Sequence, residues 1–134
     1  LATMGFALPA AIGAALARPG EPVVCLTGDG GLAMILGELE TVARLDLPVT
    51  VVVFNDAALS LIEIKQRPGQ GDAGAVRFSP VDYALVAQAM GLDAVVVTNQ
   101  AELSAALSGW HRPRLIDARI DPHPYRELIR TTRG

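Results

Sequence analysis

The segment PVVCLTGDGGLAMILGELETVARLDLPVTVVVFND, residues 22–56, determines the expected fold. It contains two continuous apolar runs, at residues 22–27 and 49–54, and each run ends at glycine or polar residues. Short runs of this kind are typical of strands buried on both faces. Between the runs, apolar side chains recur at the spacing of one helix, at Leu32, Ile35, Leu36, Leu39, Val42 and Ala43. The segment therefore predicts a strand, a glycine turn, a helix and a second strand, which together form a βαβ unit.

A βαβ unit brings the residues that follow its two strands to one place. Its strands run parallel in one sheet, so their carboxyl ends open on the same edge. Asp29 lies in the glycine-rich turn after the first strand, and Asp56 follows the second. We therefore expect Asp29 and Asp56 to lie close together.

The rest of the chain continues the alternation of strands and helices. Further strands are expected at residues 93–98 and 114–120. Further helices are expected at residues 5–17, 59–66, 79–90, 100–110 and 125–130. The predicted fold is α/β, an open parallel sheet of at least four strands with helices on both faces. It forms one incomplete domain over residues 1–134.

Two features mark the connection in the middle of the chain. Residues 67–78 contain four glycines or prolines and no periodic pattern, which predicts a mobile loop. After this loop, Ser79 is expected to cap a helix that has Pro80 at its first position, and Gly91 is expected to end that helix.

Composition excludes two classes of partner. The chain has 134 residues, 51% of them hydrophobic, and a formal net charge of -3 with scattered Lys and Arg, so it lacks the basic stripe of a nucleic-acid-binding protein. No apolar stretch reaches the ~18 residues that a membrane span requires. The single cysteine, Cys25, lies in an apolar run, which excludes an internal disulfide and predicts a buried, inert thiol in the cytoplasm.

Two motifs together resemble a known family. The tripeptide GDG, residues 28–30, follows a strand, and 24 residues (31–54) separate it from ND at 55–56 after the next strand. This arrangement is similar to the signature of thiamine diphosphate (ThDP) dependent enzymes, which ends in Asn-Asn. The segment MGFALPAAIG, residues 4–13, resembles the helix before that signature in acetolactate synthases and benzoylformate decarboxylase. By this resemblance the chain is identified as a C-terminal, diphosphate-binding domain of such an enzyme.

The resemblance implies ThDP as cofactor, with its diphosphate beside the glycine-rich turn. A diphosphate needs backbone N–H donors, and glycine lets the main chain approach it closely. Gly28, Gly30 and Gly31 are therefore expected to contact the cofactor. A Rossmann dehydrogenase is a weaker alternative, because the turn lacks the G-x-G-x-x-G spacing and places an acid beside the phosphate.

The resemblance also implies a Mg2+ ion that bridges the two phosphates. Mg2+ prefers hard oxygen ligands in octahedral order. By resemblance, Asp29 supplies a carboxylate, Asp56 a side-chain oxygen in place of the family's usual Asn, and Ala58 its backbone carbonyl. The alternative for both aspartates is a purely structural role in turns.

Four further residues match family positions. Met4 matches a bulky residue that supports the bent cofactor, and core packing is its alternative. Ala2 stands where a glycine carbonyl usually meets the aminopyrimidine. Leu61 and Lys65 match substrate-facing positions, although Lys65 also fits a solvated helix.

Other polar residues are given no role in the chemistry. Glu38 and Glu40 are two residues apart and so face different directions on a helix. His111 and His123 each stand alone, without metal-ligand spacing. All four are expected to be solvated surface residues.

The resemblance further implies a partner and a reaction. In this family an activating glutamate comes from a pyrimidine-binding domain, usually of a neighbouring subunit, and this chain lacks that domain. We therefore expect a homo-oligomer, a small 2-oxo acid substrate, a decarboxylation or carboligation of acetolactate synthase type, and no activity of the chain in isolation. The face that bears Met4, Gly30 and Ala58 is expected to expose apolar surface. The alternative is a non-catalytic domain that binds ThDP or regulates without turnover.

Overall fold

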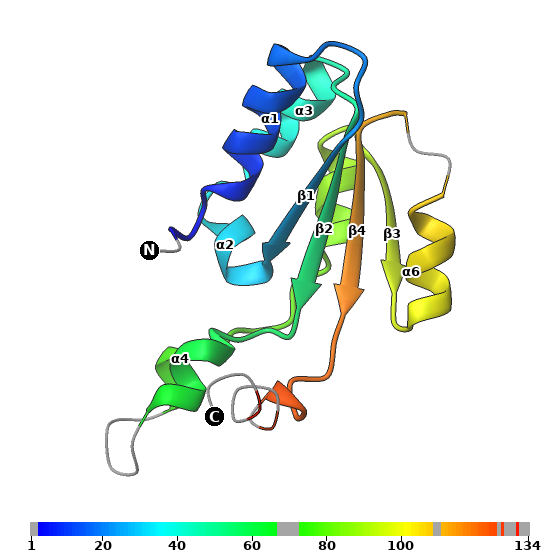
Figure 1. Ribbon diagram of the computed structural model, residues 1–134. Coiled ribbons are helices and arrows are strands. Elements are labelled where there is room, and N and C mark those ends of the chain that lie inside the picture. The colour runs from blue at the N-terminus through cyan, green and yellow to red at the C-terminus, as the bar shows by residue number, and fades with distance from the viewer. Residues whose placement is uncertain (1–2, 67–72, 109–110, 126, 128–130, 132–134) are drawn as a thin grey trace.

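The computed structural model describes residues 3–66, 73–108, 111–125, 127 and 131. These residues form four strands, β1 (Val23–Gly28), β2 (Val49–Asn55), β3 (Asp93–Val97) and β4 (Arg114–Arg119). All neighbouring strands are parallel, in the order β1-β2-β4-β3 (Figure 1). The predicted parallel α/β sheet is confirmed, and each strand lies within one residue of its expected bounds.

Helices cover both faces of the sheet, as expected. They are α1 (Ala7–Ala17), α2 (Asp29–Ala33), α3 (Glu38–Arg44), α4 (Ser60–Lys65), the short 3-10 helix η1 (Ala73–Ala75), α5 (Tyr83–Ala89) and α6 (Gln100–Ala106). The main core lies between one face of the sheet and α1, α3 and α5. A smaller core lies between α6 and the β3–β4 half of the other face. Figure 1 shows α2 beside the carboxyl end of β1 and α4 beyond that of β2, so both helices lie at the edge where the aspartates were expected.

The helix expected over residues 32–43 is wrong as a single element. The structure has α2 and α3 with a series of tight turns at residues 34–37. In these turns the N–H of Ile35 bonds to the carbonyl of Leu32, and the N–H of Glu38 to that of Ile35, which are three-residue rather than four-residue steps. Gly37, a poor helix former, lies directly before α3. The apolar residues keep their helical spacing across the junction of α2 and α3, so the periodicity of the sequence did not reveal that the helix is divided.

The cap of α5 also differs from the expectation. Asp82, not Ser79, is the N-cap, and its side chain accepts a hydrogen bond from the N–H of Leu85 at 2.9 Å. Residues 79–82 are not helical, so Pro80 lies before the helix and not at its first position. Gly91 ends the helix region with a φ of 91°, a left-handed conformation that glycine adopts without strain.

The connection between α4 and α5 is only partly described. Residues 67–72 of the expected loop lie outside the described residues, as do 109–110 and most of the closing helix expected at 125–130. At residues 76–78 the expectation of a loose loop does not hold, because Val76 is buried and Arg77 pairs with Ala58 in an antiparallel bridge.

Within the described residues, no helix has the length and apolar character needed to cross a bilayer.

Candidate functional site

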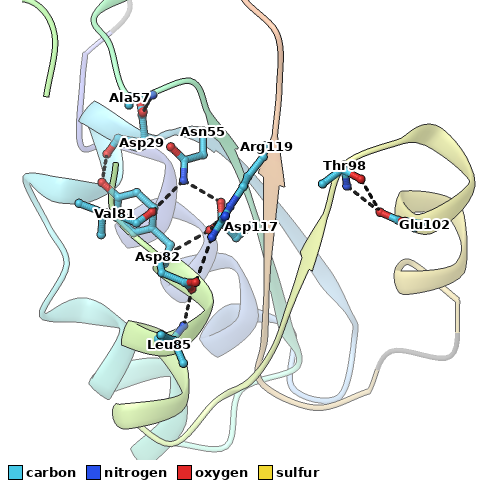
Figure 2. Close-up of polar contacts among 11 residues, drawn as sticks. Asp29, Asn55, Ala57, Val81, Asp82, Leu85, Thr98, Glu102, Asp117 and Arg119 are labelled. Atoms are coloured by element: carbon cyan, nitrogen blue, oxygen red, sulfur yellow. Dashed lines mark hydrogen bonds and ion pairs between the residues drawn. The ribbon is translucent and has the colours of Figure 1, made fainter. Parts of the chain in front are cut away.

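Asp29 occupies the junction between β1 and α2. Gly28 is the N-cap of α2 and Asp29 is its first residue, 4% exposed. Its Oδ1 accepts a hydrogen bond from the N–H of Gly30 (2.7 Å), and its Oδ2 accepts one from the N–H of Ala57 (2.8 Å). Figure 2 shows Asp29 directed at Ala57. The side chain of Asp29 thus ties the end of β1 to the turn after β2.

The surroundings of Asp29 disfavour the ionised form of its carboxyl group. Burial raises the pKa of Asp29, and the nearby charge of Asp56 raises it further, against the lowering effect of the N–H donors of Gly30, Ala57 and Asp56. Among the described residues, no Lys, Arg or His side chain pairs with either aspartate. The pair therefore forms a local concentration of negative charge that a cation would relieve.

The turn after β2 is a tight one. Asp56 Oδ1 accepts a hydrogen bond from the N–H of Ala58 (3.1 Å), and its Oδ2 accepts one from the hydroxyl of Ser60. Ala57 has a φ of 57°, a left-handed conformation that is costly for a residue with a side chain. The carbonyl of Ala57 accepts from the N–H of Phe78 (2.9 Å), which holds the turn from the other side.

A hollow of about 380 Å³ opens at this edge of the sheet. Its walls are the segments before α1, after β1 and after β2, and they include Met4, Gly28, Asp29, Gly30, Gly31, Ala58 and Leu61. Its lining is mostly apolar, with the Asp29 turn as the charged part. A larger hollow of about 590 Å³ lies at β3 and α6, away from both aspartates. We place the site in the smaller one because its walls bring together Asp29, the glycine turn and main-chain groups from two strand ends. Asp56 does not line it and instead lines a separate hollow of about 440 Å³.

The glycines of the turn let other groups approach closely. A Cβ on Gly30 would lie 2.6 Å from Leu59 Cδ2, and one on Gly31 would lie 3.1 Å from Thr27 Oγ1. The first distance excludes any side chain unless Leu59 moves. The N–H of Gly30 is already used by Asp29, so it is less free for a phosphate than its sequence position suggests.

The structure places the other expected site residues as follows. Met4, 43% exposed, and Leu61, 52% exposed, line the hollow. Lys65 is exposed at the end of α4 and does not line it. Ala2 lies outside the described residues.

The residues given no role are on the surface or outside the site. Glu40 is exposed and pairs with Arg44 (3.0 Å), Glu38 is partly buried, and both histidines are exposed. Cys25 is 3% exposed, and burial raises the pKa of its thiol to about 11, as expected for an inert cysteine.

Residues that fit Mg2+ are present, although not as a complete cage. The described residues contain no group of three or more His, Cys, Asp or Glu side chains that could hold a metal. Asp29 and Asp56 each retain lone pairs, because a carboxylate can accept about four hydrogen bonds or ligands in total. Two carboxylates leave positions for a carbonyl, phosphate oxygens and water, which suits an ion that keeps several non-protein ligands.

The sequence patterns assigned no individual role to three polar residues behind the two turns, although Asn55 belongs to the ND pair of the motif. Asn55, Tyr83 and Asp117 are buried and hydrogen-bonded to one another or to Asp29. A charged residue inside the apolar run at 114–120 was the available signal for Asp117. Tyr125 also lies near the pair, since burial and then the charges of Asp56 and Asp29 raise its pKa.

Comparisons with known proteins identify the family of this chain. The family model for the C-terminal TPP binding domain of thiamine pyrophosphate enzymes matches residues 1–118, and thiamine pyrophosphate is another name for ThDP. Acetolactate synthase isozyme 1 large subunit of Escherichia coli (strain K12) is 38% identical over 126 residues, which are 90% of this chain and 22% of that protein. Acetolactate synthase of Bacillus subtilis (strain 168) is 36% identical over 122 residues, 89% of this chain and 21% of that protein.

A solved structure is also similar. The thiamine diphosphate-dependent 4-hydroxybenzoylformate decarboxylase of Rhodococcus jostii RHA1 matches with a TM-score of 0.73 and 25% sequence identity. The match covers 88% of this chain and 23% of that one. The chain thus spans about a fifth of the length of the curated relatives that it matches.

Proposed function

This chain belongs to the family of C-terminal TPP binding domains of thiamine pyrophosphate enzymes, and from that premise we propose that it binds the diphosphate of ThDP through Mg2+ in the hollow beside Asp29. The observation that carries the proposal is the 2.8 Å hydrogen bond from the Ala57 N–H to the Asp29 carboxylate. That bond holds the ends of β1 and β2 together and supports a shared site, although Asp29 lines the 380 Å³ hollow and Asp56 lines a neighbouring hollow of about 440 Å³.

In this proposal each residue has a stated task. Asp29 and Asp56 supply carboxylate oxygens to Mg2+, and Ala58 supplies its carbonyl. The glycine turn at residues 28–31 lets the diphosphate approach the main chain. Met4 lies over Gly30, with its Cε 3.5 Å from the position of a Cβ there, where it would support the organic part of the cofactor.

We further propose that the parent reaction is a decarboxylation or carboligation of a small 2-oxo acid. When bound, ThDP supplies the electron sink for breaking or forming the bond next to the carbonyl carbon. The chain's own residues bind and orient the cofactor. Leu61 lines the hollow and is the residue that we propose to meet a substrate, whereas Lys65 does not line the hollow.

A pyrimidine-binding domain, from the same or a neighbouring subunit, is the partner that we propose for the apolar rim of the hollow. Several rim residues are large, apolar and exposed: Met4 43%, Leu26 59%, Leu61 52% and Ile62 46%. A rim of this kind favours a covered interface over open solvent. The homo-oligomer and the inactivity of the chain in isolation are part of the same proposal.

The test uses this chain assembled with a pyrimidine-binding domain, and measures ThDP binding and CO2 release from pyruvate in parallel. Binding accompanied by CO2 release supports the enzyme. Binding without CO2 release from any of a panel of 2-oxo acids would favour the alternative, a non-catalytic ThDP-binding domain. No ThDP binding under any condition would refute the proposal.

A further inference from the structure

A network of buried polar groups connects the two turns of the site from within the core. Asn55, Tyr83 and Asp117 are 8%, 3% and 0% exposed and come from β2, α5 and β4. Asp117 Oδ1 accepts a hydrogen bond from Asn55 Nδ2 at 2.9 Å, and its Oδ2 accepts one from the N–H of Tyr83 at 3.2 Å. The hydroxyl of Tyr83 in turn donates to the main-chain carbonyl of Asp29, also at 3.2 Å.

Each end of this network reaches one of the two turns. Asn55 directly precedes Asp56, and its Nδ2 also donates to the carbonyl of Val81 at 3.0 Å. Figure 2 shows the Asn55 side chain between Val81 and Asp117. At the other end, Tyr83 holds the carbonyl of Asp29, whose carboxylate is one of the two proposed ligands.

Asp117 is the acceptor that joins Asn55 to Tyr83 in this network. A carboxylate that is 0% exposed is costly to bury unless its oxygens have partners. Both oxygens have one, and Arg119 adds a charge with its Nε 3.7 Å from Oδ2. Arg119 also pairs with Asp82 at 2.9 Å, the residue that caps α5 just before Tyr83. These contacts fix the start of α5 relative to β4.

Packing of α5 does not need the hydroxyl of Tyr83. A phenylalanine would fill the same space in the core, whereas the hydroxyl adds one directed contact to the main chain of Asp29. Asp29 is then held by its carbonyl through Tyr83 and by its carboxylate through Gly30 and Ala57. Both ends of the same residue are thus pinned by different elements.

We propose that Tyr83, anchored by Asp117, is a positioning residue that fixes the main chain at Asp29 and so orients the Asp29 carboxylate. The part that concerns Mg2+ and ThDP rests on the proposed function. The part that concerns the order of the Asp29 turn does not.

The test compares Tyr83→Phe with Thr50→Val in the full chain. Tyr83→Phe removes only the hydroxyl. Thr50→Val is the matched control, because the Thr50 hydroxyl is fully buried without a partner among the described residues and lies near the opposite end of β2. Hydrogen exchange by NMR is measured at the amides of Gly30 and Ala57, which both donate to Asp29. Loss of one neutral hydrogen bond predicts exchange about fivefold faster at these two amides in Tyr83→Phe, and no such local change in Thr50→Val.

Two results would overturn the inference. One is unchanged protection of both amides in folded Tyr83→Phe. The other is a uniform increase in exchange across the whole sheet, which would mean that the hydroxyl contributes to global stability only. Asp117→Asn provides a second variant, since it presents an NH2 group to one of the two donors and should loosen the same amides.

A second readout connects the network to the cofactor. In the assembly with a pyrimidine-binding domain, Tyr83→Phe should weaken ThDP binding in Mg2+ about fivefold, with Thr50→Val at the wild-type value. Wild-type-like affinity in Tyr83→Phe would refute the effect on the site. If the wild type itself binds no ThDP, the proposed function fails, and the exchange experiment still decides the positioning role.

Discussion

The replacement of Gly30 by alanine tests how closely other groups must approach the glycine turn. The added Cβ would lie 2.6 Å from Leu59 Cδ2 and 3.5 Å from both Met4 Cε and Phe78 Cζ. The first contact is too short to persist. Leu59 Cδ2 is the end of a flexible side chain, so we expect Leu59 to rotate, while the backbone stays in place.

Two opposing terms set the change in stability. Overpacking of this kind costs about 1–3 kcal/mol. Gly30 belongs to α2, and alanine in place of glycine within a helix stabilises the fold by about 1 kcal/mol. We therefore expect the free energy of unfolding to fall by about 1 kcal/mol, as measured by urea denaturation followed by circular dichroism. The displaced Leu59 and the new methyl group both reduce the 380 Å³ hollow, so ThDP affinity should fall at least about tenfold.

Gly37→Ala is the matched control. A Cβ at Gly37 meets no atom within 4 Å, and its φ of -59° and ψ of -24° suit any residue. This variant should be neutral or more stable by a few tenths of a kcal/mol up to about 1 kcal/mol. Wild-type ThDP affinity in Gly30→Ala would show that the cofactor does not need the close approach at this turn, and would refute the reasoning.

Four other substitutions, at three positions, test particular groups. Burial raises the pKa of the Cys25 thiol from 9.0 to about 11. Between these two values the folded protein keeps a proton that the unfolded chain releases. The free energy of unfolding should therefore fall as the pH rises from 9 to 11. Cys25→Ala should lose this part of the pH dependence in urea denaturation, and an unchanged slope would contradict the assignment. The free energy of unfolding of Ala57→Gly should remain within about 1 kcal/mol of the wild-type value. That of Ala57→Val should be lower by about 2 kcal/mol, because a β-branched residue tolerates the φ of 57° poorly. Equal stabilities of the two variants would argue against strain at this residue. Asp56→Asn keeps a side-chain oxygen and should retain ThDP binding within about tenfold by calorimetry, whereas complete loss would show that the second charge is required.

Local patterns in the sequence were sufficient to predict the strands. The run around Val51 is apolar on both faces, and the structure buries it from residue 49 to residue 53. The expectation that the first strand is buried on both faces was wrong, because β1 lies at the edge of the described sheet and leaves Val24 42% and Leu26 59% exposed. The expected proximity of Asp29 and Asp56 followed from parallel strands alone. Their roles as ligands remain predictions, because proximity does not establish binding.

Features that depend on tertiary contacts were not predictable in this way. The bond between Asn55 and Asp117 joins residues 62 apart in sequence and requires β4 to lie between β2 and β3. No short-range pattern encodes that order. The same contact network sets the start of α5. Local preferences rank Ser and Asp equally as N-caps, so they could not decide between Ser79 and Asp82, and the choice of Ser79 with Pro80 after it was wrong.

The most direct test of the account is a calorimetric titration of ThDP into this chain assembled with a pyrimidine-binding domain. Wild type is titrated with Mg2+ and with chelator, beside Asp29→Ala with Mg2+. Asp93→Ala is the control, because Asp93 is an exposed carboxylate at the amino end of β3, away from the site. We predict that wild type and Asp93→Ala bind ThDP with Mg2+, and that binding is lost in chelator and in Asp29→Ala. Equal, cation-independent binding by wild type and Asp29→Ala would show that the turn at Asp29 is structural only, and would contradict the central claim.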